Sequence, residues 1–454
     1  MKGSDDMKLF QHQKDVLERL KLYNRCAMYL DMGLGKTFVG SEKMIDLGEK
    51  VNLVICQKSK VNDWVEHFNK QYEFNPKDPF AAIDLTSKGG ISIFFEMVED
   101  VQKSNFGRTF GIINYELAWR RKDLLKLYDF TLMLDESSLI QNIKAKQTKF
   151  IMKLKPKNVI LLSGTPCSGK YENLVTQANL LGWNISQEIY DRTYINYKLT
   201  EDDGSGFRHR IVDMDDPYKN VDRLKNKLRE YGAVFMKTED VLDLPEQNFN
   251  EILVDAPKEY KKFMKDDICI LLIDDFSNKI ELIGDTIFTK RLYARQLCSQ
   301  YNQHKLDALT DLIQSTQDRL IVFYNFNDEL EQLKAICKAQ NRPYSQVNGS
   351  VKDLYAYDNY SDSISLIQYQ AGAMGLNLQK ANKIIYFSLP ERSELFEQSK
   401  KRIHRIGQSK PCFYYVMMAR DTIERNIYDN LKLRKDYTDN LFVSNTTTNR
   451  YASS

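Results

Sequence analysis

The sequence predicts an α/β protein with two lobes, each built on a parallel sheet that helices cover on both faces. Short apolar runs rich in β-branched residues alternate with polar turns and longer helical patterns, which is typical of such sheets. This alternation occurs in two series, separated by a stretch of different character. A length of 454 residues suits more than one domain, and 42% hydrophobic with 28% charged residues excludes disordered and fibrous proteins.

The strands of the two series are expected at the apolar runs. The first series contains runs at 26–30, 51–56, 111–114, 130–134 and 159–162. The second series begins after His304 and contains runs at 319–323, 363–368, 384–387 and 413–417. Charged helical patterns lie between most strands of the first series, so its strands should run parallel.

The stretch between the two series loses the alternation. Segments such as 221–231 and 258–300 look helical and mixed in charge. We therefore expect a first lobe over 1–190, a mainly helical insertion and connector over 191–304, and a second lobe over 305–454.

Charge and cysteine usage exclude several classes of protein. Lys plus Arg is 65 and Asp plus Glu is 62, a net charge of +3, which argues against a polyanion-binding surface over the whole chain but permits a local basic stripe. Seven scattered cysteines and five histidines show neither disulfide nor metal spacing, so we assign them structural roles. The longest apolar run, from Ile268, has six residues, and we expect a cytoplasmic protein without a membrane segment.

A strand, a glycine-rich turn and a Lys-Thr pair stand at 31–37, with the sequence DMGLGKT. In such a turn, backbone N–H groups surround phosphate oxygens, Lys36 neutralises their charge, and the Thr37 hydroxyl can bind Mg²⁺. Leu30 stands where the common pattern has its first glycine. The alternative is an ordinary turn between a strand and a helix.

Two adjacent carboxylates, Asp135 and Glu136, follow the strand at 130–134. Ligands of open α/β sheets bind at the carboxyl ends of strands, where one carboxylate can hold Mg²⁺ and the other can orient or deprotonate water. A charged helix N-cap is the alternative for this pair alone. A phosphate-binding loop about a hundred residues earlier favours the catalytic interpretation.

Motifs along most of the chain resemble, in order, those of the Swi/Snf-type ATPases, the DNA-translocating branch of the superfamily-two helicases. In the first lobe they are LFQHQ (9–13), DMGLGKT (31–37), LVICQKSKVNDWVEHF (53–68), INYE (113–116), DESS (135–138) and LLSGTP (161–166). In the second lobe they are LIVFYNF (320–326), AGAMGLNL (371–378) and QSKKRIHRIGQ (398–408), of which the last is the most specific. KTEDVLDLP (237–245) resembles the family's segment before the second lobe.

The resemblance implies two RecA-like lobes that bind ATP with Mg²⁺, which Thr37 and Asp135 would hold. The implied ATP-binding residues are Gln13, Met32, Gly33, Leu34, Gly35, Lys36, Thr37, Gly375, Arg402 and Arg405. Arg402 and Arg405, spaced i, i+3 on an expected helix, would supply the cation that catalysis needs from the second lobe. The alternative for these two is a solvated basic face.

Some positions depart from the family pattern. Ser138 replaces a common His, Gln368 and Gln370 stand where Ser and Arg are usual, and Met236 replaces an Arg. Ser138 and Gln370 put in doubt how tightly hydrolysis is coupled to DNA.

A basic run is the first candidate for contacts with nucleic acid. Residues 137–171 contain no Asp or Glu but seven lysines, at 144, 146, 149, 153, 155, 157 and 170. The alternative is a solvated helix face. The resemblance adds further candidates, so that the full set is Lys58, Tyr115, Lys144, Lys146, Asn325 and Tyr369. For Trp64 and Trp119, core packing is favoured over base stacking.

The leading hypothesis is therefore a monomeric, ATP-driven motor that moves along double-stranded DNA largely independently of sequence and displaces or remodels bound proteins. We expect it in the cytoplasm of a bacterial cell or of a virus-infected bacterial host. One alternative is a strand-separating DNA or RNA helicase. The other is a nucleic-acid-binding scaffold without hydrolysis, which the five intact catalytic candidates disfavour: Lys36, Asp135, Glu136, Arg402 and Arg405.

Overall fold

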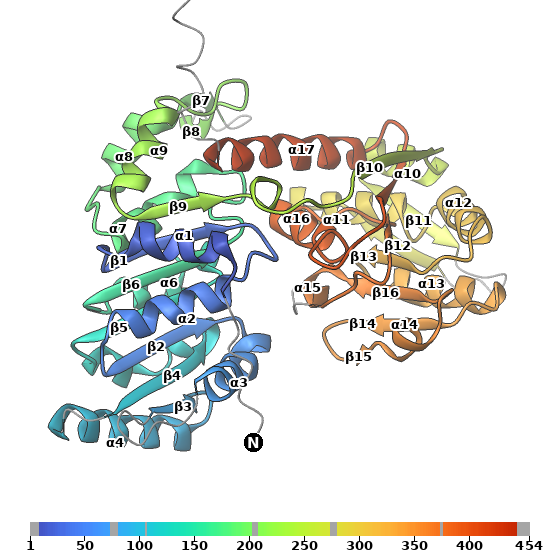
Figure 1. The fold of residues 1–454 in the computed structure, drawn as a ribbon. Helices are drawn as coiled ribbons and strands as arrows, with labels where there is room; N and C mark the ends of the chain where they lie inside the picture. Colours follow the sequence, from blue (N-terminus) through green and yellow to red (C-terminus); the bar gives the residue numbers. More distant parts are fainter. Residues whose placement is uncertain are drawn as a thin grey trace, which may run out of the picture. The chain divides into compact units, whose positions relative to one another are not determined.

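The chain folds into two compact α/β units, as the two series of strands predicted (Figure 1). The computed structural model describes residues 9–72, 80–104, 107–201, 208–272, 279–372 and 376–442. Unit 1 comprises Met1–Val241 and Asp436–Ser454, and unit 2 comprises Leu242–Lys435. Each unit is built on a seven-stranded sheet.

The sheet of unit 1 is parallel throughout. In spatial order its strands are β3 (Phe80–Asp84), β4 (Arg108–Asn114), β2 (Val51–Cys56), β5 (Phe130–Asp135), β6 (Asn158–Ser163), β1 (Arg25–Leu30) and β9 (Ala233–Met236). The helices of this unit are α1 (Gln11–Leu20), α2 (Lys36–Asp46), α3 (Val61–Gln71), α4 (Lys88–Ser104), α5 (Tyr115–Ala118), α6 (Lys146–Ile151), α7 (Val175–Leu180), α8 (Gln187–Tyr194), α9 (Val221–Glu230) and the end of α17 (Ile423–Phe442). All five expected strands of the first series are present.

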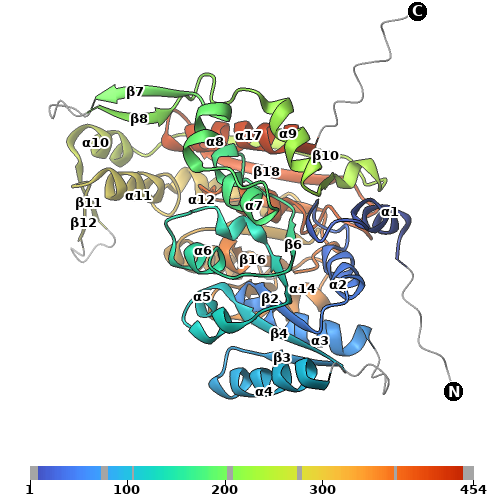
Figure 2. The same ribbon diagram turned by 90° about the vertical axis from the view of Figure 1, so that its left-hand side faces the viewer.

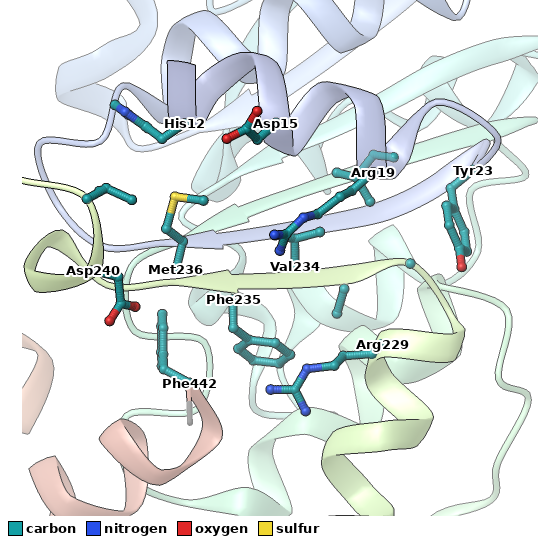
Figure 3. Close-up of a pocket in the computed structure, with 14 residues that line it drawn as sticks. His12, Asp15, Arg19, Tyr23, Arg229, Val234, Phe235, Met236, Asp240 and Phe442 are labelled. Carbon is teal, nitrogen blue, oxygen red and sulfur yellow. The ribbon is translucent and has the colours of Figure 1, made fainter. Parts of the chain in front are cut away.

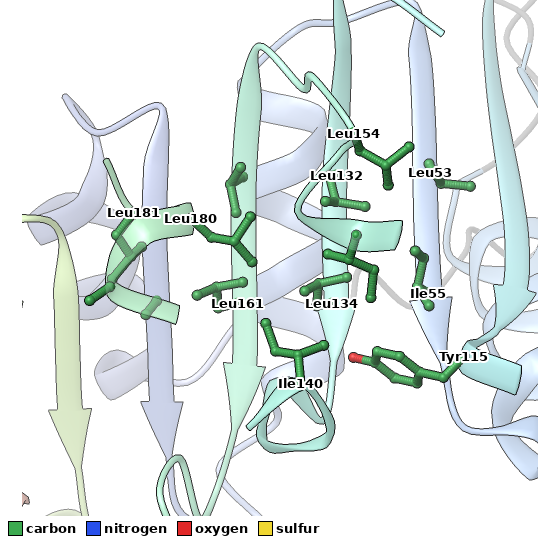
Figure 4. Close-up of a cluster of buried hydrophobic side chains, with 14 of the residues drawn as sticks. Leu53, Ile55, Tyr115, Leu132, Leu134, Ile140, Leu154, Leu161, Leu180 and Leu181 are labelled. Atoms are coloured by element: carbon green, nitrogen blue, oxygen red, sulfur yellow. The ribbon is translucent and has the colours of Figure 1, made fainter. Parts of the chain in front are cut away.

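Both faces of this sheet are covered, because successive strand residues point to opposite sides. On one face Leu132, Leu134 and Leu161 pack with Ile140 and with residues of α7 (Figure 4). On the other face α2 approaches so closely that a Cβ at Gly40 would lie 2.8 Å from Leu162 Cδ1. The strands are therefore apolar on both sides and read as unbroken hydrophobic runs.

The sheet of unit 2 is parallel except for its last strand, β15, which runs antiparallel to β14. Its spatial order is β10 (Gln247–Val254), β18 (Cys412–Ala419), β17 (Lys383–Tyr386), β13 (Leu320–Tyr324), β16 (Ile364–Gln368), β14 (Tyr344–Val347) and β15 (Lys352–Asp353). The helices are α10 (Lys258–Asp266), α11 (Ile287–Cys298), α12 (Gln303–Gln314), α13 (Asn327–Ala339), α14 (Tyr355–Asn359), α15 (Tyr369–Gly372), α16 (Ser393–Lys400) and most of α17. The four expected strands of the second series are β13, β16, β17 and β18.

The segment 191–304 contains more strand than its sequence predicted. In its described part, β9 joins the first sheet and β10 joins the second. Two hairpins stand apart from these sheets: β7 (Tyr197–Glu201) with β8 (Arg208–Val212), and β11 (Ile268–Leu272) with β12 (Lys279–Ile283). Figure 2 shows the hairpin of β7 and β8 extending from the part of unit 1 that holds α8 and α9. β7, β8, β10 and β12 mix polar with apolar residues, whereas β9 (AVFM) and β11 (ICILL) are apolar runs. β11 lies in the segment 258–300, which was expected to be helical.

All seven cysteines are buried free thiols, which agrees with structural roles. Burial raises the pKa of Cys26 and of Cys337 to about 12, so both stay protonated near neutral pH. In the part of the chain that the structure describes, no helix is long and apolar enough to cross a membrane.

Candidate nucleotide-binding site

The glycine-rich turn lies where a phosphate-binding loop should lie, between β1 and α2. Gly33 and Gly35 have φ of 89° and 77°, in the left-handed region that favours glycine. Gly35 is the N-cap residue of α2, and Lys36 is the first residue of that helix. The first backbone N–H groups of α2 therefore lie at this turn, as an anion site requires.

The ammonium group of Lys36 is hydrogen-bonded to the backbone at the start of this loop. Its Nζ donates to the carbonyl oxygens of Leu30 at 2.9 Å and Asp31 at 3.3 Å. Gly164, in the turn after β6, packs beside it, because a Cβ there would lie 3.3 Å from Lys36 Nζ. The SGT turn after β6 thus contacts the lysine that should neutralise phosphate charge.

Gln13 holds α1 against the same loop. Its Nε2 donates to Leu34 O at 3.2 Å, and its Oε1 accepts from Phe10 N at 2.9 Å. A Cβ at Gly35 would lie 2.1 Å from Gln13 Nε2, so another residue there would displace the end of the Gln13 side chain. His12, which the sequence placed among structural histidines, also contacts Leu34 O, at 3.3 Å.

The first residue of the loop is fixed by the segment after β9. Asp31 Oδ2 accepts from Thr238 Oγ1 at 2.9 Å, and Asp31 Oδ1 accepts from Met32 N at 2.8 Å. Thr238 belongs to the KTEDVLDLP segment, so that segment supports the loop directly.

Asp135 stands at the end of β5 and is held from α3. The indole Nε1 of Trp64 donates to Asp135 Oδ2 at 2.8 Å. Burial raises the pKa of the Asp135 carboxyl, and the charge of Glu136 adds to this, whereas the Trp64 hydrogen bond and the charge of Lys36 oppose it. Trp64 is therefore a buried residue, as expected, but it also orients a candidate catalytic group.

Glu136 adopts an uncommon backbone conformation and is held by two hydroxyls. Its φ of 58° and ψ of 58° lie in the left-handed region, which costs about 1–3 kcal/mol for a residue other than glycine and often marks functional sites. Its Oε1 accepts from Ser138 Oγ and Ser163 Oγ, each at 2.9 Å. Ser138, where the resembled family has His, therefore contacts the acid directly, and Ser163 joins the end of β6 to it.

Gln177, on α7, connects three segments around the site through hydrogen bonds of its side-chain amide. Its fully buried side-chain Oε1 accepts from Ser137 Oγ at 2.8 Å and Tyr29 Oη at 3.0 Å. Its Nε2 donates to Pro166 O at 2.7 Å. One amide thus ties β1, the acidic pair and the turn after β6 together. No motif marked this residue, because its partners lie far from it in sequence.

The donors expected for Mg²⁺ have suitable chemistry. A hydroxyl and a carboxylate are hard oxygen ligands, and Mg²⁺ usually completes its shell with phosphate and water. Thr37 is the second residue of α2 and half-buried, and Asp135 Oδ1 accepts no hydrogen bond from the described residues. No group of three or more His, Cys, Asp or Glu in the described ranges could hold a metal ion.

Arg402 and Arg405 lie in unit 2, in turns rather than on a helix. α16 ends at Lys400, and the next turns are irregular because Arg402 N donates to Ser399 O while Ile403 N and His404 N both donate to Lys400 O. The expectation of a shared helical face was therefore wrong. Arg402 is 3% exposed. Arg405 is half-buried, its guanidinium donates to Asn377 Oδ1, and burial lowers its pKa. Gly375 lies outside the described residues.

The basic run is mainly at the surface. Six of its lysines are exposed, and Lys170 is half-buried. Lys58, in a 3-10 turn at Lys58–Lys60, is also exposed. Lys146 Nζ and Arg120 Cζ lie 5.3 and 5.1 Å from the ring centroid of half-buried Trp119. Arg120, which sequence reasoning missed, thus forms a basic and aromatic cluster with Lys146 and Trp119.

The side chains of three other candidates for contacts with nucleic acid form hydrogen bonds inside the protein. Tyr115 is 1% exposed and donates to Asp135 O at 3.0 Å, while Tyr369 is 3% exposed and donates to Ser388 O at 3.0 Å. The amide of half-buried Asn325 donates to Ser388 Oγ at 2.9 Å and Leu389 O at 3.0 Å. Neither tyrosine ring is accessible for a contact with DNA, contrary to expectation.

A glycine-rich phosphate loop and an acidic pair at the carboxyl edge of a parallel sheet, with a second α/β unit in the same chain, define a two-lobed P-loop nucleotide-binding protein. The chain matches the SNF2-related domain over residues 12–303 and the helicase conserved C-terminal domain over residues 304–407. It therefore belongs to the SNF2-related family of helicase-like ATPases, as its motifs indicated.

Curated relatives match along most of this chain. The ISWI chromatin-remodeling complex ATPase ISW1 of Saccharomyces cerevisiae is 24% identical over 89% of this chain and 38% of that protein. The DNA repair and recombination protein RAD54 of the same yeast is 22% identical over 95% of this chain and 54% of that protein. An uncharacterized ATP-dependent helicase of Mycoplasma genitalium is 22% identical over 87% of this chain and 38% of that protein. The chain thus spans about two fifths to one half of these relatives.

A solved structure is also similar. The Sulfolobus solfataricus SWI2/SNF2 ATPase core in complex with double-stranded DNA matches 96% of this chain and 93% of that chain, with 19% identity and a TM-score of 0.44.

Proposed function

We propose that the protein hydrolyses ATP and uses the energy to move along double-stranded DNA, displacing or remodelling proteins bound there. The observation that carries this proposal is the convergence of Lys36, Asp135 and Glu136 at one sheet edge, linked by Ser163 at the end of β6 and by Gly164 in the turn after it. Phosphoryl transfer needs neutralised charge and a positioned water, and these residues offer both.

Each residue has a distinct role in the proposed reaction. Lys36 and the N–H groups of the loop would bind the phosphates, and Gln13 would bind the adenine. Mg²⁺ bound by Thr37 and Asp135 would shield the charge on the phosphates. Glu136, oriented by Ser138 and Ser163, positions the attacking water and accepts its proton.

The second lobe would complete the site with Arg402 and Arg405. An arginine that stabilises the transition state increases the rate roughly 10³- to 10⁵-fold in related phosphoryl transfer. Hydrolysis would therefore require both lobes, which is how nucleotide turnover would drive motion. We propose the exposed residues Lys58, Lys144 and Lys146, with Arg120, as contacts to DNA phosphates.

The test is steady-state ATP hydrolysis without nucleic acid and with duplex DNA, single-stranded DNA or RNA. We expect stimulation by duplex DNA that weakens as salt increases, because phosphate contacts release counterions. Lys36→Ala should reduce hydrolysis at least roughly 10³-fold. Lys14→Ala, at an exposed position of α1, is the control and should match the unsubstituted protein.

The outcomes separate the hypotheses. Absence of hydrolysis in every condition would refute the motor and favour a binding scaffold. Equal stimulation by RNA would refute duplex specificity. Displacement of one strand from a labelled duplex, with no displacement of a triplex-forming third strand, would indicate a strand-separating helicase instead of a translocase.

A further inference from the structure

The outer edge of the sheet in unit 1 presents unpaired peptide groups. β9 is the last strand of this sheet, and no described segment pairs with its outer side. Ala27 N donates to Gly232 O, and Asp31 N donates to Met236 O, each at 2.9 Å. This register directs the peptide groups of Val234 and Met236 toward β1, so those of Ala233 and Phe235 face away from the sheet.

The residues of this edge line a cavity of about 740 Å³ (Figure 3). The cavity follows β9 from Gly232 to Met236, and none of its lining residues belongs to the phosphate loop. His12, Asp15 and Arg19 of α1 line one wall. Phe235 and Phe442, with Arg229, line the opposite wall.

The outward-facing peptide groups of β9 favour an extended peptide as the ligand. Ala233 is only 4% exposed, so its N–H and C=O groups have little access to bulk water, and buried peptide groups are normally paired. A strand added to β9 offers donors and acceptors alternately at the spacing of the groups on Ala233 and Phe235. A rounded small molecule does not reproduce this pattern.

The residues on the two sides of the cavity determine which side chains of that peptide fit. Side chains of an added strand alternate between the two walls. One wall presents the rings of Phe235 and Phe442, with Arg229 Cζ 5.2 Å from the centroid of the Phe235 ring. The other presents the exposed guanidinium of Arg19, which forms no ion pair with the described residues. Two carboxylates that line the cavity already accept hydrogen bonds: Asp15 from Gln11 Nε2 at 2.8 Å, and Asp240 from Lys237 N at 3.2 Å.

We propose that the outer edge of β9 binds an extended segment of a partner protein, in which apolar and acidic residues alternate, as an eighth strand of the sheet. The apolar residues lie against Phe235 and Phe442, and an acidic residue lies against Arg19. Residues 443–454, which follow Phe442 in the sequence, contain no Asp or Glu and so offer no acidic residue for Arg19. The inference concerns binding alone and does not depend on ATP hydrolysis.

The test measures fluorescence anisotropy of labelled eight-residue peptides with the full chain. An alternating Glu-Val peptide should bind saturably, and a scrambled peptide of the same composition should bind at least fivefold more weakly. Arg19→Glu should weaken the Glu-Val peptide about fivefold and strengthen a Lys-Val peptide. Lys14→Glu, exposed on the same helix but outside the cavity, should change neither.

Peptides methylated on alternate backbone nitrogens test the pairing itself. Methylation of the amides that face β9 should abolish binding, whereas methylation of the other set should not. Equal effects of both sets, or equal effects of Arg19→Glu and Lys14→Glu, would overturn the proposal. Binding that appears only after removal of residues 1–8 or 443–454 would assign the edge to this chain's own terminus and would also overturn it.

Discussion

Among single residues, Gln177 shows how the nucleotide site depends on side chains outside its motifs. Its amide accepts two hydroxyl hydrogen bonds and donates one to a carbonyl, in a fully buried position. In such a place each polar group is satisfied only while its partners keep their positions. The acidic pair is thereby held in register with β1 and with the turn after β6.

Gln177→Leu tests this role, because leucine has a similar volume but no polar atoms. The hydroxyls of Tyr29 and Ser137 and the carbonyl of Pro166 would lose their partner, at a total cost of about 2–4 kcal/mol in the free energy of unfolding. We also expect kcat for ATP hydrolysis to fall about tenfold with little change in KM, because the acidic pair would be displaced. Urea denaturation and steady-state kinetics measure the two effects.

Gln11→Leu is the matched control, because that amide is exposed and bonds only to Asp15 on the surface. It should leave both quantities unchanged. A Gln177→Leu protein with reduced stability but unchanged kcat would assign Gln177 to the core alone.

The sequence predicted the motif residues but not their supports. Lys36, Asp135 and Glu136 were recognisable because each follows a buried strand in sequence and chemistry of this kind needs those residue types. Ser163 was within reach of the same argument, since it ends the next strand. Gln177 and Thr238 were not, because their roles arise from contacts with segments distant in the chain.

At the scale of elements, α3 links an aromatic cluster to the acidic pair. His67 lies with its ring centroid 5.0 Å from Phe38, 5.6 Å from Trp64 and 5.7 Å from Phe68. Its Nε2 contacts Ser41 Oγ at 2.9 Å. Burial lowers the pKa of His67 to about 4, so the folded protein favours the neutral ring. Trp64 also donates a hydrogen bond to Asp135, so protonation of His67 should weaken the packing that positions Asp135.

The pH dependence of stability tests this cluster. The unfolded chain protonates this histidine near pH 6.5, whereas the folded protein does so only near pH 4, so stability should fall as pH decreases between these values. Because the ring is partly exposed, we expect His67 to contribute about 1–2 kcal/mol of this loss.

Urea denaturation at pH 7 and pH 5 of the unsubstituted protein and of His67→Gln measures that contribution. The variant should lose less stability over this interval. His304→Gln, at an exposed site, should behave like the unsubstituted protein. A His67→Gln protein with the same pH dependence as the unsubstituted protein would contradict the prediction.

Strands buried on both faces were predictable, whereas edge elements were not. All nine expected strands are present, because continuous apolar runs have few other uses in a protein of this composition. β9 (AVFM) is an apolar run of four residues in a stretch without alternating strand and helix patterns, and β10 begins with polar residues, so neither was expected as a strand. The helix expected around Arg402 ends at Lys400, since the backbone bonds of the following turns are set by local packing that periodicity does not encode.

At the scale of the whole molecule, unit 1 is discontinuous in sequence. Residues from Asp436 onward belong to it, although 194 residues of unit 2 precede them. Leu441 is fully buried in the core of unit 1, and Phe442 packs against Phe235 with ring centroids 5.5 Å apart. Lys225 Nζ donates to Asn440 Oδ1 at 2.6 Å, and Tyr171 Oη donates to Tyr437 O at 2.8 Å. Two lobes were predictable from two series of strands. The packing of the C-terminal residues against the first lobe was not.

Leu441→Ala should therefore destabilise unit 1. Truncation of a buried leucine costs about 2–5 kcal/mol, and we expect the loss in the unfolding of the unit that contains the phosphate loop. Hydrogen exchange of β1 and β9 amides, followed by mass spectrometry, reports on that unit separately. Asp436→Ala, exposed on the same helix, should have little effect. Unchanged exchange in β1 and β9 of Leu441→Ala would contradict this assignment.

The discontinuity also sets the order in which the protein can mature on the ribosome. The chain emerges from its N-terminus, so the phosphate loop and acidic pair are made long before residues 436–442. Until then Phe235 lacks its ring contact with Phe442, and the core of the first unit lacks Leu441. Synthesis of the entire second unit therefore separates the phosphate loop and the acidic pair from the residues of α17 that complete the core of the first unit.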